Sequence, residues 1–204
     1  MHKNIDITFY LIRHVQCEKN KYPDIIGGLS FDSPVSELGE RQIIKLKKRL
    51  ADFLFDEIYV SPAVRTLETA RAVEGRLILK EPALLEQSQG DWQGKSREEV
   101  YNHENKSYIN TKGYHFIPPA GESQRMVERR ISNWIEDKFL YNPQYLDKKY
   151  FIVLFTHGML IKCFLHYVLG FSDRLIYIIE LDNASITSVT FNSEGWHVNY
   201  INRI

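Results

Sequence analysis

Two short apolar runs constrain the fold of this chain more than any other feature of its sequence. Ile7 to Ile12 (ITFYLI) and Tyr150 to Thr156 (YFIVLFT) are rich in β-branched and aromatic residues. Uninterrupted apolar runs of this length are typical of strands that are buried on both faces, as in parallel sheets. The chain is therefore expected to build a central sheet that is covered on both sides.

Several segments that follow the first run are predicted to form helices, which could cover the sheet. Apolar residues recur at helical spacing within Ser36 to Asp52, and Ser36 is a candidate N-cap. A strand is expected at Glu57 to Val60, followed by a helix that opens at Ser61-Pro62 with Pro at its first position. Gly121 to about Leu140 is expected to form a further amphipathic helix.

The remaining elements are predicted from weaker patterns. A brief strand at Leu77 to Leu79 and a short helix near Ser96 to Asn102 are expected, as is an apolar helix after Gly158. Alternating hydrophobic and polar residues predict three strands in the tail. These are Leu175 to Glu180, Ile186 to Phe191 and Trp196 to Ile201.

Strands that alternate with helices predict an α/β protein. The expected architecture is a three-layer αβα sandwich, with a mostly parallel central sheet and helices on both faces. The length of 204 residues fits a single domain over residues 1–204. Between residues 81 and 119 the periodicity breaks down into Gly, Pro, Asn, Lys and aromatic residues. A segment of this length without periodicity predicts a lid or insertion at about residues 86–120.

Composition limits the partners of the chain. Lys plus Arg equals Asp plus Glu at 26 each, so the overall charge gives no indication of nucleic acid or of an anionic membrane. No stretch reaches about 18 uninterrupted apolar residues, and the first residues do not resemble a signal peptide. Cys17 and Cys163 lack metal-ligand spacing, so reduced thiols in the cytoplasm are expected.

Histidines follow both of the apolar runs. Arg13-His14 comes directly after the first run, and His157-Gly158 comes directly after the second. Because ligands of parallel sheets bind beyond the carboxyl ends of the strands, both pairs occupy a position suited to a ligand site. Either histidine alone is more often structural, whereas two at equivalent positions favour a local anion site.

Six blocks of the sequence resemble the histidine phosphatase superfamily, which includes phosphoglycerate mutases. The blocks are LIRHVQCEKN, DSPVSELGERQ, YVSPAVRTLETA, LLEQSQGDWQG, PPAGES and VLFTHGMLIKCF. They occur in the order of the family and together cover about residues 7 to 165. The resemblance implies a phosphomonoesterase that acts on a small phosphorylated metabolite through a phosphohistidine intermediate.

The resemblance also implies the roles of the catalytic residues. His14 would be the nucleophile, and nearby Arg charges would help to keep its ring neutral. Arg13 and Arg65 would bind the phosphate through their planar guanidinium groups. His157 would be a second imidazole ligand of the phosphate. Glu86 would protonate the leaving oxygen and later activate water.

Further positions are expected to contact the phosphate or the rest of the substrate. Asn20 and Gly158 are expected at the phosphate. Gln16, Cys17 and Gly28 are candidate substrate-binding residues. No metal and no cofactor is expected, because Arg and His would supply the cationic surroundings. His103, His115 and His166 are set aside because no partner lies at a useful spacing.

The sequence departs from the family directly after the proposed nucleophile. Val15 stands where Gly is usual, Gln16 where an acidic residue is common, and Cys17 where a hydroxyl residue is usual. Two alternatives therefore stay open: phosphotransfer of the phosphoglycerate mutase type, and a non-catalytic module that binds a phosphorylated ligand. The short segment between Glu86 and Gly121 favours hydrolysis over a mutase. A homodimer is left open as the assembly.

Overall fold

The computed structural model describes residues 4–30 and 32–204. Residues 1–3 and 31, which the predicted domain of 1–204 includes, lie outside the described residues. A six-stranded sheet in the order β3-β2-β4-β1-β5-β6 forms the centre of the described part. Its strands are β1 (Asp6–Arg13), β2 (Glu57–Val60), β3 (Leu79–Lys80), β4 (Lys149–Thr156), β5 (Ile186–Asn192) and β6 (Gly195–Arg203).

The first four strands run parallel, and the last two are antiparallel additions at one edge. β1 pairs with β4, β4 with β2 and β2 with β3, all in parallel. β5 pairs antiparallel with both β1 and β6. The mostly parallel sheet expected from the apolar runs is thus confirmed.

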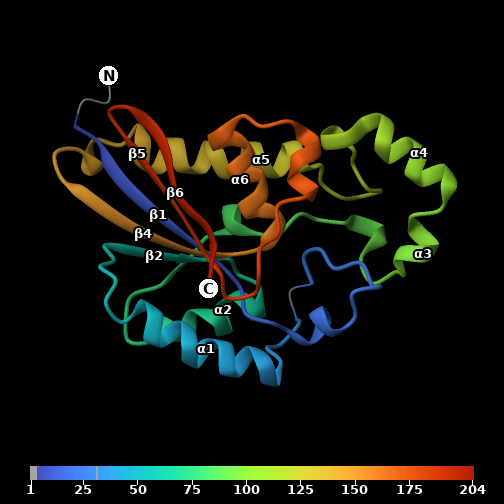
Figure 1. The fold of residues 1–204 in the computed structure, drawn as a ribbon, viewed down its shortest axis with the longest axis horizontal. Coiled ribbons are helices and arrows are strands. Elements are labelled where there is room, and N and C mark those ends of the chain that lie inside the picture. The colour runs from blue at the N-terminus through green and yellow to red at the C-terminus, as the bar shows by residue number, and fades with distance from the viewer. Residues whose placement is uncertain (1–3, 31) are drawn as a thin grey trace.

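Helices cover both faces of this sheet, as the αβα prediction requires (Figure 1). The described α-helices are α1 (Glu37–Leu50), α2 (Val64–Thr69), α3 (Arg97–Val100), α4 (His103–Lys112), α5 (Gln124–Ile135) and α6 (Gly158–Leu169). Figure 1 shows α5 and α6 together on one side of the strands and α1 and α2 on the other. None of the described helices has the length and apolar character needed to cross a bilayer.

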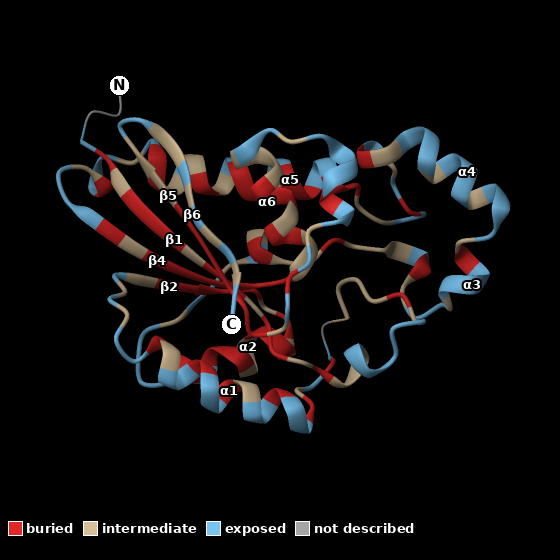
Figure 2. Cartoon of the chain, in the orientation of Figure 1, coloured by how far each residue is buried: buried red, intermediate tan, exposed pale blue. Residues whose placement is uncertain are grey.

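Alternation along the central strands divides the core into two clusters. Phe9 and Leu11 of β1 belong to the cluster under α5 and α6, whereas Ile12 belongs to the cluster with α1. Leu154 and Phe155 of β4 divide in the same way. Figure 2 shows these central strands coloured as buried along most of their length. Burial on both faces explains why both runs are apolar without interruption.

Most predicted elements occur close to their expected positions. Ser36 caps α1 as expected, because its side chain accepts a hydrogen bond from the backbone N–H of Gly39. The helical prediction up to Leu140 is met by α5 and a π-helical turn at Glu136–Leu140. The brief third strand lies at Leu79–Lys80, shifted slightly along the chain.

Two predicted elements differ from the structure. The helix expected to open at Ser61-Pro62 begins at Val64, because Ser61 still donates its N–H to the carbonyl of Phe155 on β4. The strand expected at Leu175 to Glu180 is wrong: Asp173–Tyr177 forms a 3-10 helix, η8. Only Ile176 of η8 is buried, so the alternating pattern there did not mark the face of a sheet.

One helix is missing from the prediction altogether. α4 occupies His103–Lys112, within the segment that lacks hydrophobic periodicity, and none of its residues is buried. Figure 1 places α3 and α4 to one side of the molecule, away from the strands. Because α4 buries no apolar face, the pattern that reveals other helices is absent from its sequence.

Candidate active site

The sheet topology brings the two predicted histidines together. β1 and β4 are parallel neighbours, and Arg13 is in register with Thr156. His14 and His157 follow these residues directly, and the centroids of their rings are 5.4 Å apart. The backbone N–H of His14 donates to the carbonyl of Thr156 at 2.9 Å, which extends the strand pairing to the histidine itself.

The tautomer of His14 is set by its own neighbour. Its Nδ1 lies 2.7 Å from the carbonyl oxygen of Val15. Because a carbonyl can only accept a hydrogen bond, Nδ1 carries the proton and Nε2 keeps its lone pair. The partner of Nδ1 is thus a backbone carbonyl.

The His14 ring is neutral at physiological pH. Burial, and then the positive charges of Arg65 and Arg13, hold the pKa of His14 well below its usual value. The side chain is only 5% exposed. A neutral ring with a free Nε2 lone pair has the properties of a nucleophile.

Two residues that the sequence analysis did not single out fix the backbone around His14. The side-chain amide of Asn183 donates to the carbonyl oxygen of His14 at 2.9 Å. The N–H of Val15 donates to the hydroxyl of Thr69 at 3.0 Å. Asn183 lies just before β5, which runs antiparallel to β1, so the start of β5 meets the end of β1. This topological signal could have located Asn183, whereas Thr69 lies in the block YVSPAVRTLETA but was given no role there.

Arg13 lies against the start of α6. One guanidinium nitrogen donates to the carbonyl of Leu181, and Nε is buried without a partner among the described residues. A Cβ atom at position 158 would lie 3.3 Å from Nε. Gly158 therefore leaves room for the Arg13 guanidinium rather than itself lining the pocket described below. A buried N–H group without a partner is suited to binding an anion.

His157 is completely buried behind His14 and does not line that pocket. Its Nε2 lies 2.8 Å from the hydroxyl of Ser61, while Nδ1 has no partner among the described residues. Burial, followed by the charges of Arg65 and His14, holds the pKa of His157 well below its usual value. Its free Nδ1 is a second buried polar atom at the site that lacks a partner.

Arg65 lies in the first turn of α2 and is 4% exposed. One nitrogen of its guanidinium donates to the carbonyls of Leu29 and Ser30, each at 2.8 Å, and another donates to Gly28 at 3.2 Å. Gly28 has a φ of +95°, a conformation that favours glycine. Arg65 thus reaches the site while it holds a loop that lines the same pocket.

The carboxylate of Glu86 contacts the N-terminus of α6. It accepts hydrogen bonds from the backbone N–H groups of Gln87 at 2.9 Å and of Met159 and Leu160 at 3.2 Å each. Burial lowers the pKa of both Arg13 and Arg65, and the negative charge of Glu86 opposes this effect at each. The carboxylate is therefore electrostatically coupled to both guanidinium groups.

The other expected contacts separate into two groups. Asn20, Cys17 and Gly28 line the pocket. The amide oxygen of Asn20 accepts from the backbone N–H of Cys17 at 3.0 Å, which holds the loop after His14. Gln16 does not line the pocket, because its side chain accepts a hydrogen bond from the hydroxyl of Ser36. Gln16 thus contacts the N-cap of α1 instead.

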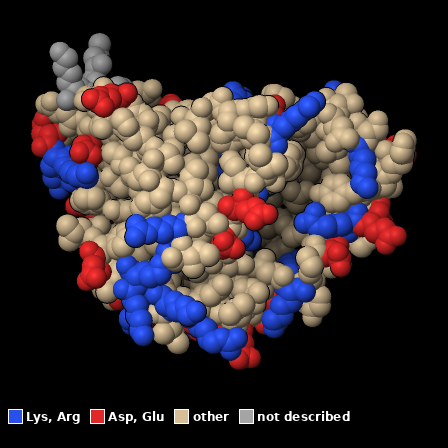
Figure 3. Space-filling model, viewed as in Figure 1, with Lys and Arg blue, Asp and Glu red and all other residues tan. Residues whose placement is uncertain are grey.

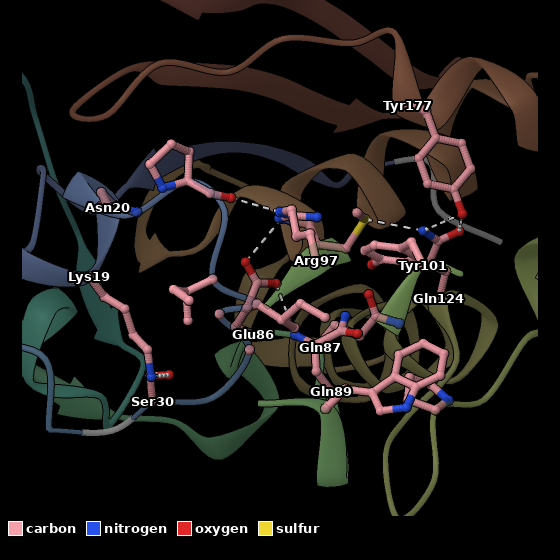
Figure 4. A pocket seen from close by; sticks show the side chains of 18 of the residues that line it. Lys19, Asn20, Ser30, Glu86, Gln87, Gln89, Arg97, Tyr101, Gln124 and Tyr177 are labelled. Atoms are coloured by element: carbon pink, nitrogen blue, oxygen red, sulfur yellow. Dashed lines mark hydrogen bonds between the residues drawn. The ribbon is translucent and has the colours of Figure 1, made fainter. Parts of the chain in front are cut away.

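A pocket of about 1150 Å³ connects these groups with the segment at 86–120. Arg13, His14, Arg65 and Glu86 all line it. Figure 3 shows a hollow on this face with Lys and Arg side chains at several points around it, and Figure 4 shows Glu86 among the lining side chains. Eleven of the lining residues come from positions 87–118: Gln87, Gln89, Trp92, Arg97, Tyr101, Lys106, Ile109, Asn110, Gly113, Phe116 and Pro118.

Two other observations concern metals and the remaining histidines. No group of three or more His, Cys, Asp or Glu side chains within residues 4–30 and 32–204 is arranged to hold a metal ion. His166, which lacked a partner in the sequence analysis, lies 2.5 Å from a carboxylate oxygen of Glu128 and 3.1 Å from one of Asp173. Neither His166 nor Glu128 lines the pocket.

Comparisons with known proteins identify the family. The family model "Histidine phosphatase superfamily (branch 1)" matches residues 9–204. A protein of Hydrogenobacter thermophilus, provisionally named phosphoserine phosphatase 2, is 26% identical over 96% of this chain and 95% of its own length. The 2,3-bisphosphoglycerate-dependent phosphoglycerate mutase of Bartonella henselae is 27% identical over 92% of this chain and 94% of its own.

A solved structure resembles the whole fold. The mycobacterial glucosyl-3-phosphoglycerate phosphatase superposes with a TM-score of 0.82 at 21% identity, covering 98% of this chain and 100% of its own. At this identity, the similarity establishes the shared fold.

Proposed function

The chain belongs to the histidine phosphatase superfamily, which confirms the family and the phosphatase class predicted from its sequence, and we propose that it hydrolyses phosphomonoesters through a phosphohistidine at His14. The observation that supports this most directly is the state of His14. Its Nδ1 is bound to a carbonyl, its ring is neutral, and it lines one pocket with Arg13, Arg65 and Glu86. The substrate is expected to be a small phosphorylated metabolite.

In the first step, Nε2 of His14 attacks phosphorus. A nitrogen–phosphorus bond forms while the bond from phosphorus to the leaving oxygen breaks. Glu86 must enter this step protonated, and it transfers that proton to the leaving oxygen and becomes a carboxylate. Arg13, Arg65 and Nδ1 of His157 stabilise the charge on the phosphoryl oxygens. Asn20 has an amide nitrogen available for the same purpose, since only its oxygen is used by the Cys17 loop.

In the second step, water attacks the phosphohistidine. Glu86 accepts a proton from the water, a new oxygen–phosphorus bond forms, and the nitrogen–phosphorus bond returns its electron pair to Nε2. Two of the three backbone N–H donors of Glu86 bind one carboxylate oxygen and the third binds the other, so the second oxygen keeps a lone pair for this proton. The segment at about 86–120 would act as the lid of the pocket during both steps.

Labelling of the protein tests the intermediate. The protein is incubated briefly with a radiolabelled phosphomonoester and denatured, and the label is mapped. Label that is lost in acid, retained in alkali and located at His14 is the expected result. Stable label on a serine or on an aspartate would contradict the proposal, as would turnover without any labelled protein under several quench times.

The related mutase sequence makes phosphotransfer the second candidate function. Incubation with a phosphoglycerate separates the two. Release of inorganic phosphate supports hydrolysis, whereas movement of phosphate between hydroxyl groups would support the mutase. Binding of phosphorylated ligands without either reaction would favour a non-catalytic module. The cytoplasmic location and the homodimer stay predictions.

A further inference from the structure

The wall of the pocket is far more basic than the chain as a whole. Among the described residues that line the pocket, six are Lys or Arg and one, Glu86, is acidic. The chain as a whole has a net charge of zero. Two of the basic residues, Arg13 and Arg65, are already assigned to the reacting phosphate. The other four are Lys19, Arg97, Lys106 and Arg174. The pocket therefore carries more positive charge than one phosphate group uses.

All four of these residues come from elements outside the sheet, and Lys19 lies on a 3-10 helix (Glu18–Lys21) close to His14 in the chain. Arg97 lies on α3, Lys106 on α4 and Arg174 on η8. Figure 1 shows α3 and α4 beyond the carboxyl ends of the strands, at the far side of the molecule from the start of β1. We call the part of the pocket that Arg97, Lys106 and Arg174 line the outer end.

None of the three residues takes part in an ion pair with another described residue. Nε of Arg97 donates to the carbonyl of Pro23 at 2.8 Å, which leaves its two terminal nitrogens available. Basic side chains that face one cavity repel each other, and an anion bound between them relieves this repulsion.

The size of the pocket also exceeds what a small substrate needs. A volume of about 1150 Å³ is at the upper end of the range in which proteins bind drug-sized ligands. Aromatic surface is also available in the pocket, because Tyr101 and Tyr177 both line it, and Figure 4 shows both among the lining side chains. A phosphoester of three carbons would leave most of this space empty.

We propose that the substrate of this pocket is an extended phosphomonoester with a second anionic group, which Arg97, Lys106 and Arg174 bind at the outer end. This rests on the proposed phosphatase function, since the ester end occupies the site at His14. The second group is either a carboxylate or a further phosphate. The carbon skeleton between the two anions would lie against Tyr101 and Tyr177.

A matched series of aryl phosphates tests this proposal. All members share one phenol leaving group, and a flexible tail on the ring ends in a neutral amide, a carboxylate or a phosphonate. We expect kcat/KM to be roughly tenfold higher for the anionic tails than for the amide. Preference for the carboxylate or for the phosphonate identifies which anion is bound. Equal kcat/KM for all three tails would overturn the proposal.

Single variants assign the effect to the outer end. Arg97→Gln, Lys106→Gln and Arg174→Gln should each reduce the advantage of the anionic tails about threefold to tenfold, while kcat/KM for the amide tail stays constant. Lys112→Gln is the matched control, because Lys112 lies on α4 with Lys106 but does not line the pocket. An equal loss in Lys112→Gln would show a general charge effect and would count against the site.

The outcome is distinguishable from failure of the proposed function. Hydrolysis of the amide-tailed ester that depends on His14, without any preference for an anionic tail, would remove the outer site and leave the phosphatase. If no ester is hydrolysed, calorimetric titration with the non-hydrolysable phosphonate analogues of the three esters decides. Tighter binding of the doubly anionic analogues would support the outer site, and equal binding would reject it.

Discussion

The two ends of the pocket are built in opposite ways. At the strand ends, His14 and Arg65 are 5% and 4% exposed and are held by backbone carbonyls. At the outer end, α4 buries none of its residues, and Lys106 and Arg174 are exposed. Under the proposed function, the reaction would take place where the core fixes each atom, whereas the rest of the substrate would meet side chains that can adjust. A change at the strand ends should affect every substrate, and a change at the outer end only some.

The largest loss of activity is expected when the proposed nucleophile is replaced. His14→Ala should lower the hydrolysis of a simple aryl phosphate by roughly 10⁴-fold or more and remove the acid-labile label, because no other group can form the intermediate. His103→Ala is the matched control, since His103 is exposed on α4 and does not line the pocket. Activity or label that survives in His14→Ala would contradict the role of His14.

Replacing the acid should produce the next largest effect. Glu86→Gln keeps the shape of the side chain but cannot donate a proton, so kcat for an alkyl phosphate should fall about 10²-fold or more. An aryl phosphate should lose much less, because a phenol leaves without protonation. Parallel measurement of both ester types gives the ratio. Equal losses for the two would mean that Glu86 acts on charge or structure rather than on the leaving group.

Asn183 allows a smaller, indirect test of the strand ends. Asn183→Ala removes the hydrogen bond to the His14 carbonyl, so the ring should lose part of its alignment and kcat should fall about tenfold. KM should change little, because Asn183 does not line the pocket. A variant that changes only the melting temperature, with kcat unaltered, would show a structural role alone.

The pH dependence of stability tests the neutral state of the buried histidines. Their pKa values are lowered in the folded protein, so below about pH 6.5 the unfolded chain binds protons that the folded protein does not. Each histidine should therefore remove up to about 1.4 kcal/mol of unfolding free energy per pH unit as the pH falls below 6.5. Urea unfolding between pH 7 and pH 5 measures this slope.

His14→Gln isolates the contribution of one ring. Its unfolding free energy should fall less steeply with decreasing pH than that of the wild type. His197→Gln is a suitable control, because His197 is largely exposed. If His14→Gln and the wild type show the same slope, then His14 is not held neutral in the folded state.

The segments that the sequence predicted well are those that serve the core. The runs at 7–12 and 150–156 had to be apolar because both faces of each strand are covered, and β1 and β4 match them closely. The same reasoning wrongly predicted a strand at η8, since the alternating residues there do not lie on a sheet. α4 was missed because a helix without a buried face carries no hydrophobic period.

The residues of the site also divide into those that the sequence predicted and those that it did not. Arg13, His14, Arg65 and Glu86 were identified from short motifs and lie together in one pocket. Gln16 was expected at the substrate and instead contacts the cap of α1. Asn183 was missed because its contact joins segments that are distant in the chain. Thr69 lies in a quoted block, but its contact with Val15 also joins distant segments, so the block did not reveal its role.

The sequence by itself determined the covered parallel sheet, the order of its main elements and the chemical identity of the groups at the two strand ends. Only the tertiary structure decided which atom of each group is free. The carbonyl of Val15 selects Nε2 of His14, the hydroxyl of Ser61 leaves Nδ1 of His157, and folding sets the outer basic residues around one cavity. The physical reason is that residue types and local periods are properties of the chain, whereas tautomers, burial and the meeting of charges depend on three-dimensional neighbours.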